Sequence, residues 1–165
     1  MSKINYAELP EAVRLFAGMD IDKCIFSFIS CDGNAKKNID LLLPRMTEVM
    51  PHIHKALDIA IEADLPATVC SYPLCFLRGY EKHCEELHAP VKYIRDAEIL
   101  WENFHKISEE KARVEGAPCR QCGYELLCAG PRRDYVEKFG WNEFSPVPGE
   151  KILSAEELLE AEGNG

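Results

Sequence analysis

The chain has 165 residues, a formal net charge of −9 and a hydrophobic content of 47%, and its isoelectric point is near 5.1. This length and composition suit one domain, or a part-domain with an appendage, that buries an apolar core. The acidic balance excludes a nucleic-acid-binding protein, which needs a basic face. No apolar run reaches the roughly 18 residues of a membrane span, and Met1–Asn5 lack the apolar segment of a secretory signal. We therefore expect a cytoplasmic protein with no nucleic-acid or membrane partner.

The N-terminal residues predict a short helix followed by a strand. Residues 5–17 place apolar side chains on one helical face, with Asn5 and Glu8 spaced as a capping box and Gly18 as a stop. Residues 22–30 form an almost unbroken apolar run, which is typical of a parallel strand covered on both faces. The polar stretch 31–38 then follows at the carboxyl end of the strand, where α/β proteins bind ligands.

The next segment predicts a long helix and a second strand. Apolar residues recur at intervals of three and four over 45–64, and residues 67–72 have the length and composition of a strand. His52 and His54 are two residues apart, so they point in different directions on a helix, and we expect them to be solvated. Strand, helix and strand in this order indicate a parallel βαβ unit.

Two parallel strands cannot form a complete domain, because both of their edges stay open. Either strands such as 91–95 extend the sheet or another polypeptide does. The remaining sequence predicts helices over 79–87 and 97–112, a short segment over 131–139, and an acidic helix after a capping box formed by Ser154 and Glu157.

Three cysteines follow a C-x2-C-x5-C spacing at Cys119, Cys122 and Cys128, bounded by turn residues. The chain has eight cysteines and no export signal, so the thiols should be reduced and available for metal or redox chemistry. A C-x2-C turn directs two thiolates to one side of a loop, and both zinc and iron–sulfur clusters accept such ligands. A fourth ligand must come from elsewhere, or the site stays open.

From about residue 20 to 147 the chain resembles the C-terminal half of a radical S-adenosylmethionine (radical SAM) enzyme. The likeness is carried by Phe26-Ser-Phe, Gly33-Asn-Ala, Asn38, Pro44-Arg-Met-Thr-Glu, Tyr72-Pro-Leu-Cys75, Gly79-Tyr80, the C-x2-C-x5-C motif, Gly130, Tyr135 and Phe139-Gly-Trp-Asn-Glu-Phe144. The resemblance implies an α/β fold: the C-terminal part of a partial (β/α)6 barrel over 1–90, then a small cysteine-rich twitch- or SPASM-like extension over 91–150. Residues 151–165 would form an acidic helical tail.

The resemblance also implies an auxiliary [4Fe–4S] cluster. SPASM domains continue the motif with a further cysteine where this chain has Arg132, so a single, twitch-like cluster is expected. In twitch-like domains one ligand lies just after the last barrel strand, and Cys75 holds that position. Cys84 is the next candidate and Cys70 the last. Cys24 and Cys31 flank an apolar strand and are expected to be packing residues.

The C-x3-C-x2-C motif that binds the SAM-cleaving cluster in that family does not occur in this sequence. The resemblance therefore implies a partner chain that carries the N-terminal half-barrel, or a homodimer, with S-adenosyl-L-methionine bound only with that partner. Gly33, Asn34 and Asn38 would then lie near this cofactor. No catalytic residue is assigned.

The expected function is the auxiliary-cluster half of a radical SAM oxidoreductase or maturase, whose cluster binds substrate at an open iron or transfers an electron. One alternative is a structural zinc module without catalytic activity, in which His83 or His88 completes the site. Another is a thiol redox protein that works through Cys119 and Cys122.

Overall fold

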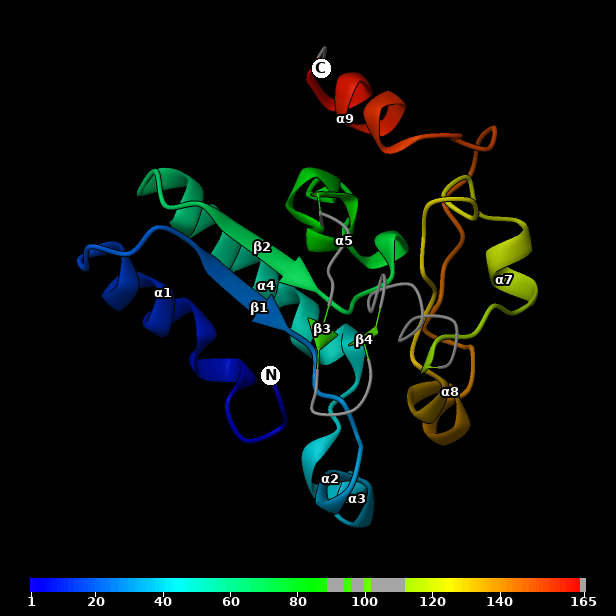
Figure 1. Cartoon of the computed structure of the whole chain (residues 1–165), viewed down its shortest axis with the longest axis horizontal. Coiled ribbons are helices and arrows are strands. Elements are labelled where there is room, and N and C mark those ends of the chain that lie inside the picture. The colour runs from blue at the N-terminus through cyan, green and yellow to red at the C-terminus, as the bar shows by residue number, and fades with distance from the viewer. Residues whose placement is uncertain (89–93, 96–99, 102–111, 164–165) are drawn as a thin grey trace.

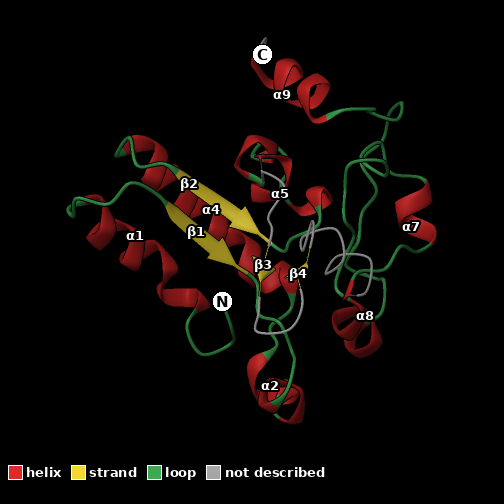
Figure 2. Cartoon of the chain, in the orientation of Figure 1, coloured by secondary structure: helices red, strands yellow, loops and turns green. Residues whose placement is uncertain are grey.

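The computed structural model of the chain describes residues 1–88, 94–95, 100–101 and 112–163. It is a mixed α/β structure with one parallel pair of strands, β1 (Cys24–Ser27) and β2 (Ala67–Cys70), and several helices (Figures 1 and 2). Cys24 lies opposite Ala67 and Ser27 opposite Cys70. The predicted parallel βαβ unit is therefore confirmed, although both strands are shorter than expected.

The first helix is confirmed, but its expected cap is not formed. A 3-10 turn, η1 (Tyr6–Glu8), leads into α1 (Leu9–Ala17), which ends at Gly18. Asn5 caps nothing; its side-chain oxygen instead accepts a hydrogen bond from the backbone N–H of Ser2 at 2.8 Å. The Asn5 side chain bonds to Ser2 and not to the first turn of the helix, so the capping-box prediction was wrong.

The long helix α4 (Met46–Glu62) runs behind β1 and β2 and supplies most of the core (Figure 1). Its buried residues are Met46, Val49, Met50, Ile53, Ala56, Leu57 and Ala60. Solvation of the two histidines was wrongly predicted: both are half-buried, and the His54 ring stacks on that of Tyr80 at a centroid distance of 4.6 Å. His52 meets the ring of Tyr6 edge-on at 5.2 Å.

The first strand is not covered on both faces, contrary to the sequence prediction. Its side chains alternate between buried and exposed, and Ile25 is 51% exposed. The alternation arises because α1 and α4 pack together on one side of the strand pair. In Figure 1, α4 lies behind both strands and α1 lies beside β1.

A second, separate sheet pairs β3 (Ile94–Arg95) with β4 (Leu100–Trp101) in antiparallel orientation. The strand expected over 91–95 is therefore present in part, but it does not extend the parallel sheet. A helix over 97–112 was wrongly predicted at residues 100–101, which form a strand; most of that range, and the side chains named for its inner face, lie outside the described residues. The described ranges contain no barrel.

The other helical elements are short and lie in loops around the strands. They are α2 (Asn34–Lys37), α3 (Ile39–Leu42), η2 (Leu74–Phe76), η3 (Glu81–His83), α5 (Glu85–His88), α7 (Ala117–Arg120), α8 (Arg133–Phe139) and α9 (Ala155–Gly163). The helix expected over 79–87 is thus two short turns. In the expected tail helix the Ser154 hydroxyl accepts the Glu157 N–H at 3.1 Å, and Leu158 is buried. No helix among the described residues has the length and apolar character to cross a membrane.

Candidate metal centre

Four cysteine side chains line one cavity in the C-terminal part of the structure. They are Cys75, Cys119, Cys122 and Cys128, the four residues that the sequence singled out as metal ligands. The cavity holds about 400 Å³ of space free of protein atoms, including solvent at its mouth. The other lining residues are four prolines (Pro73, Pro118, Pro131 and Pro146), Glu115, Glu125, Gly130, Phe144 and Ser145. All four cysteines are free thiols.

Hydrogen bonds within the C-x2-C-x5-C loop bring its three cysteines to one side. Cys119 lies in α7, and its backbone carbonyl accepts the N–H of Cys122 at 2.9 Å. The N–H of Cys128 donates to the carbonyl of Tyr124 at 2.9 Å. The five residues between Cys122 and Cys128 therefore form a turn that returns the chain to the cavity.

Cys75 reaches the same cavity from the other part of the chain. It lies in η2, directly after β2 and the turn at Pro73. Because Pro73 fixes the chain direction at the exit of the strand, the next turn points Cys75 toward the loop. The fourth side chain is thus supplied from about 45 residues before the motif.

Backbone N–H groups point at two of the four sulfurs. Leu74 and Gly130 each donate to Cys128 Sγ at 3.4 Å, and Val147 donates to Cys122 Sγ at 3.4 Å. Such donors favour the thiolate over the thiol. They are also the contacts that tune a thiolate-bound metal or cluster.

Burial disfavours the thiolate form of Cys75, Cys119 and Cys128 when nothing is bound. It raises the pKa of Cys75 to about 12, with further contributions from Cys128, Cys122 and Cys119. Burial likewise raises the pKa of Cys128 to about 11 and outweighs the two N–H donors, which act in the opposite direction. Burial also raises the pKa of Cys119. A reactive thiol needs a lowered pKa, so the raised pKa of Cys119 does not favour this residue as a redox thiol.

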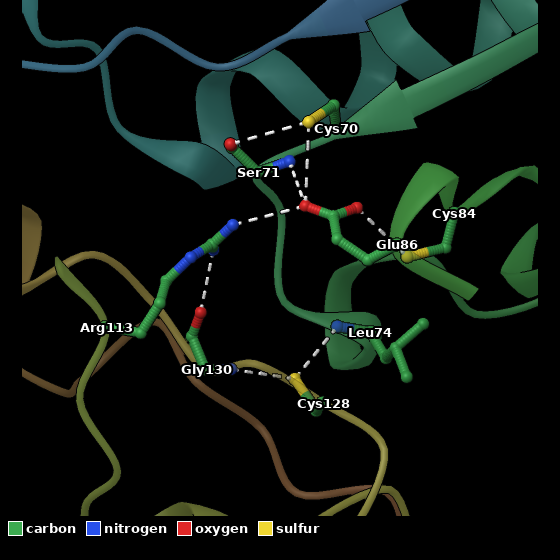
Figure 3. Close-up of polar contacts among 8 residues, drawn as sticks. All are labelled: Cys70, Ser71, Leu74, Cys84, Glu86, Arg113, Cys128 and Gly130. Atoms are coloured by element: carbon green, nitrogen blue, oxygen red, sulfur yellow. Dashed lines mark hydrogen bonds and ion pairs between the residues drawn. The ribbon is translucent and has the colours of Figure 1, made fainter. Parts of the chain in front are cut away.

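The other four cysteines lie outside the cavity. Cys70 and Cys84 both donate to the carboxylate of Glu86, at 3.7 and 3.4 Å (Figure 3). Cys24 and Cys31 are buried in the core, as expected of packing residues. Of the three candidates for the fourth ligand, only Cys75 lines the cavity with the motif.

The residues expected near S-adenosyl-L-methionine lie at a different place. Gly33, with φ of +56°, precedes α2, and the Asn38 side chain donates to the backbone carbonyl of Asn34 at 2.9 Å. All three residues are exposed. Gly33, Asn34 and Asn38 do not line the cysteine cavity. The Asn38 side chain thus closes a local turn.

The histidines of the zinc alternative do not join the cysteines. His83 Nδ1 lies 2.8 Å from the carbonyl of Ala67, and His88 Nε2 lies 2.7 Å from that of Lys82. Across the part of the chain that the structure describes, no three His, Cys, Asp or Glu side chains are arranged to hold a metal ion. The four thiols of Cys75, Cys119, Cys122 and Cys128 line one cavity.

Several residues around the cavity were missed by sequence reasoning. Lys151 donates to the carbonyls of Arg120 and Cys122, at 2.7 and 2.8 Å, and pairs with Glu125 at 2.7 Å. Glu86 and Arg113 form another ion pair. Neither ion pair belongs to a sequence motif. The two partners of each pair are far apart in the sequence, so no pattern predicts the contact.

Comparison with known protein families, with curated proteins and with solved structures finds no match to this chain.

Proposed function

We propose that the chain is an iron–sulfur protein in which Cys75, Cys119, Cys122 and Cys128 bind one [4Fe–4S] cluster. The observation that carries the proposal is the cavity lined by these four thiols, one of which comes from a distant segment. The N–H groups that face Cys122 and Cys128 support it, because hydrogen bonds to sulfur are a regular feature of cluster sites.

A [4Fe–4S] cluster and a single zinc ion need different spacings of the four sulfurs. Four sulfurs on one zinc ion each lie about 2.3 Å from the metal, and therefore roughly 3.8 Å from one another. A four-iron cluster gives each thiolate its own iron, so the sulfurs stand around a larger volume. The described side chains form no site for a single ion, but four of them share one cavity.

A cluster held by four protein thiolates has no open iron. Such a site suits electron transfer or structural support. The sequence analysis also allowed substrate binding at an open iron, and four protein ligands exclude that role. When bound, the cluster would supply a one-electron couple. The chain's own residues would exclude water through the proline-rich wall and Phe144, and would orient the sulfurs through backbone donors.

The finer proposal is that this chain is the auxiliary-cluster part of a radical SAM oxidoreductase or maturase in the cytoplasm. Its support is the resemblance together with the parallel unit formed by β1, α4 and β2. The missing strands of a (β/α)6 barrel, and the binding of S-adenosyl-L-methionine near Gly33, Asn34 and Asn38, would then require a partner chain or a second copy.

The test is the metal content of protein purified without oxygen. We expect about four irons and four sulfides per wild-type chain, with broad visible absorption. Cys75→Ser should lose most of the iron and the colour. Cys70→Ser is the matched control, because Cys70 also lies near the end of β2 but faces Glu86 and should retain both.

Two results would contradict the proposal. One zinc and no sulfide per chain would indicate a structural zinc module. Equal iron in Cys75→Ser and the wild type would remove Cys75 from the ligand set, and the same comparison with Cys84→Ser would then test Cys84.

A further inference from the structure

A buried ion pair lies between the cysteine cavity and two of the cysteines outside it, Cys70 and Cys84. Arg113 Nη2 lies 3.2 Å from Glu86 Oε1, and the two side chains are only 8% and 12% exposed. Figure 3 shows Glu86 between the sulfurs of Cys70 and Cys84 on one side and Arg113 on the other. A buried ion pair is stable only when its remaining polar atoms are satisfied.

Glu86 and Arg113 also form hydrogen bonds with the backbone of the two segments that supply the cavity's cysteines. Glu86 Oε1 also accepts the backbone N–H of Ser71, at 2.6 Å, just after β2. Arg113 Nη1 donates to the carbonyl of Gly130 at 2.9 Å. The pair thus joins the strand exit that leads to Cys75 with Gly130, two residues after the motif.

Gly130 is the contact between this ion pair and a candidate ligand. Its N–H donates to Cys128 Sγ, while its carbonyl accepts from Arg113. Its φ is +76°, and a Cβ at this position would lie 2.5 Å from the carbonyl oxygen of Val114. The N–H of Val114 in turn donates to the carbonyl of Pro131 at 3.0 Å. Arg113 and its neighbour therefore fix the backbone whose N–H faces the sulfur.

We propose that Arg113, held by Glu86, is a positioning residue that raises the reduction potential of a cluster bound at Cys128 by fixing the Gly130 N–H against its sulfur. This inference rests on the proposed function. Reduction adds one electron to the cluster, and an N–H group aimed at a ligand sulfur stabilises the added negative charge. A fixed donor at 3.4 Å raises the potential, and a mobile one does so less.

Two substitutions separate the position of the donor from the charge of Arg113. Arg113→Met removes both the charge and the fork that bridges Glu86 and Gly130. Arg113→Lys keeps the charge, but a single ammonium group cannot reproduce the fixed fork. Arg14→Met is the control, because Arg14 is an exposed arginine of α1 paired with Glu11.

The experiment titrates the iron-loaded wild type and variants with dithionite and follows the visible spectrum. We expect both Arg113 variants to retain iron and to be reduced less readily. The expected change in the reduction equilibrium is about tenfold, which is about 59 mV for a one-electron couple. Amide hydrogen exchange in the metal-free protein supplies a second readout: the Gly130 N–H should exchange at least about tenfold faster in Arg113→Lys than in the wild type.

Three outcomes would overturn the inference. Wild-type potential in both iron-loaded variants would contradict it while leaving the cluster proposal intact. Wild-type potential and Gly130 exchange in Arg113→Lys, with a shift in Arg113→Met, would show that charge rather than position sets the potential. Absence of iron and sulfide from the wild type would overturn the proposed function and this inference with it.

Discussion

Two buried tyrosines, Tyr135 and Tyr72, differ in whether the hydroxyl group forms hydrogen bonds. The Tyr135 hydroxyl accepts the N–H of Met46 at 2.8 Å and donates to Glu143 at 2.7 Å. The Tyr72 hydroxyl is buried and finds no hydrogen-bond partner among the residues that the structure describes. Burial raises the pKa of both phenols, so both are neutral and able to donate. The two hydroxyls should therefore differ in their effect on stability.

We predict opposite effects on stability from removing these hydroxyls. Tyr135→Phe leaves the Met46 N–H and the Glu143 carboxylate short of a partner, and should lower the free energy of unfolding by about 1.5–3 kcal/mol. Tyr72→Phe removes an unsatisfied polar atom and should leave stability unchanged or raise it by up to about 1 kcal/mol. Urea unfolding of the metal-free proteins measures both. A larger loss in Tyr72→Phe than in Tyr135→Phe would contradict the assignment.

At the scale of elements, the N-terminus of α4 is held by the segment that follows α8. Glu143 accepts hydrogen bonds from the Thr47 N–H at 3.3 Å and the Thr47 hydroxyl at 3.2 Å, and it also pairs with Arg45. An acceptor at this place satisfies a free N–H of the first helical turn and complements the helix dipole. The contact joins residues almost 100 positions apart and ties the cysteine-rich part of the chain to the main helix.

The pH dependence of stability follows from the charge of Glu143. Burial opposes its ionisation, but hydrogen bonds from Tyr135, Arg45 and Thr47 outweigh burial and lower its pKa. A carboxyl whose pKa is lower in the folded state stabilises the fold above its unfolded pKa of about 4.3, and this contribution is lost as the pH falls through the folded value.

Glu143→Gln should therefore reduce stability at pH 7 and make it depend less on pH below about 4.3. We expect a loss of about 1.5–3 kcal/mol at pH 7, because the bonds removed are to a charged acceptor that is only 8% exposed. Urea unfolding at several pH values measures the difference. Glu62→Gln removes an exposed carboxylate at the other end of α4 and is the control. Parallel stability curves for Glu143→Gln and the wild type would contradict this role.

The sequence predicted those features that depend on local order. Periodicity located α1 and α4, and the cysteine spacing located three side chains that share a cavity. Asn5 failed as a cap because a nearer N–H, that of Ser2, took its oxygen. The Glu86–Arg113 pair and the contact of Glu143 with α4 could not be predicted, because ionic partners far apart in sequence follow no period.

Cys75 is an intermediate case between local and long-range prediction. Its place after a strand and beside Pro73 suggested the site, but composition alone could not separate it from Cys70 and Cys84. The structure separates them because Glu86 accepts from the two other thiols and directs them away from the cavity. A carboxylate that no motif includes thus decides which cysteine faces the loop.

At the scale of the whole molecule, the outer edge of β1 pairs with no other strand among the described residues. The N–H groups of Cys24 and Phe28 donate to the carbonyls of Pro66 and Cys70, on the side of β1 that faces β2. Backbone groups of the residues between Cys24 and Phe28 alternate in direction, so some of them point away from β2. Met1 lies along one end of this edge, where its carbonyl accepts the N–H of Ile29 at 3.1 Å. The rest is bordered by a groove lined by Phe16, Met19, Ile21, Lys23, Cys24, Ile25 and Phe26.

An open strand edge beside an apolar groove favours pairing with another chain. Since the proposed function requires a partner chain or a second copy, we expect the isolated chain to associate with itself through this edge. Its apparent mass in sedimentation velocity should rise with protein concentration. Ile25→Lys places a charge on the edge strand at a residue that is 51% exposed, so it should weaken association without removing core packing.

The control is Leu41→Lys, which changes an exposed leucine on α3, away from this edge, and should associate as the wild type does. A monomer mass for the wild type at every concentration, or equal association of Ile25→Lys and the wild type, would show that this edge does not mediate self-association.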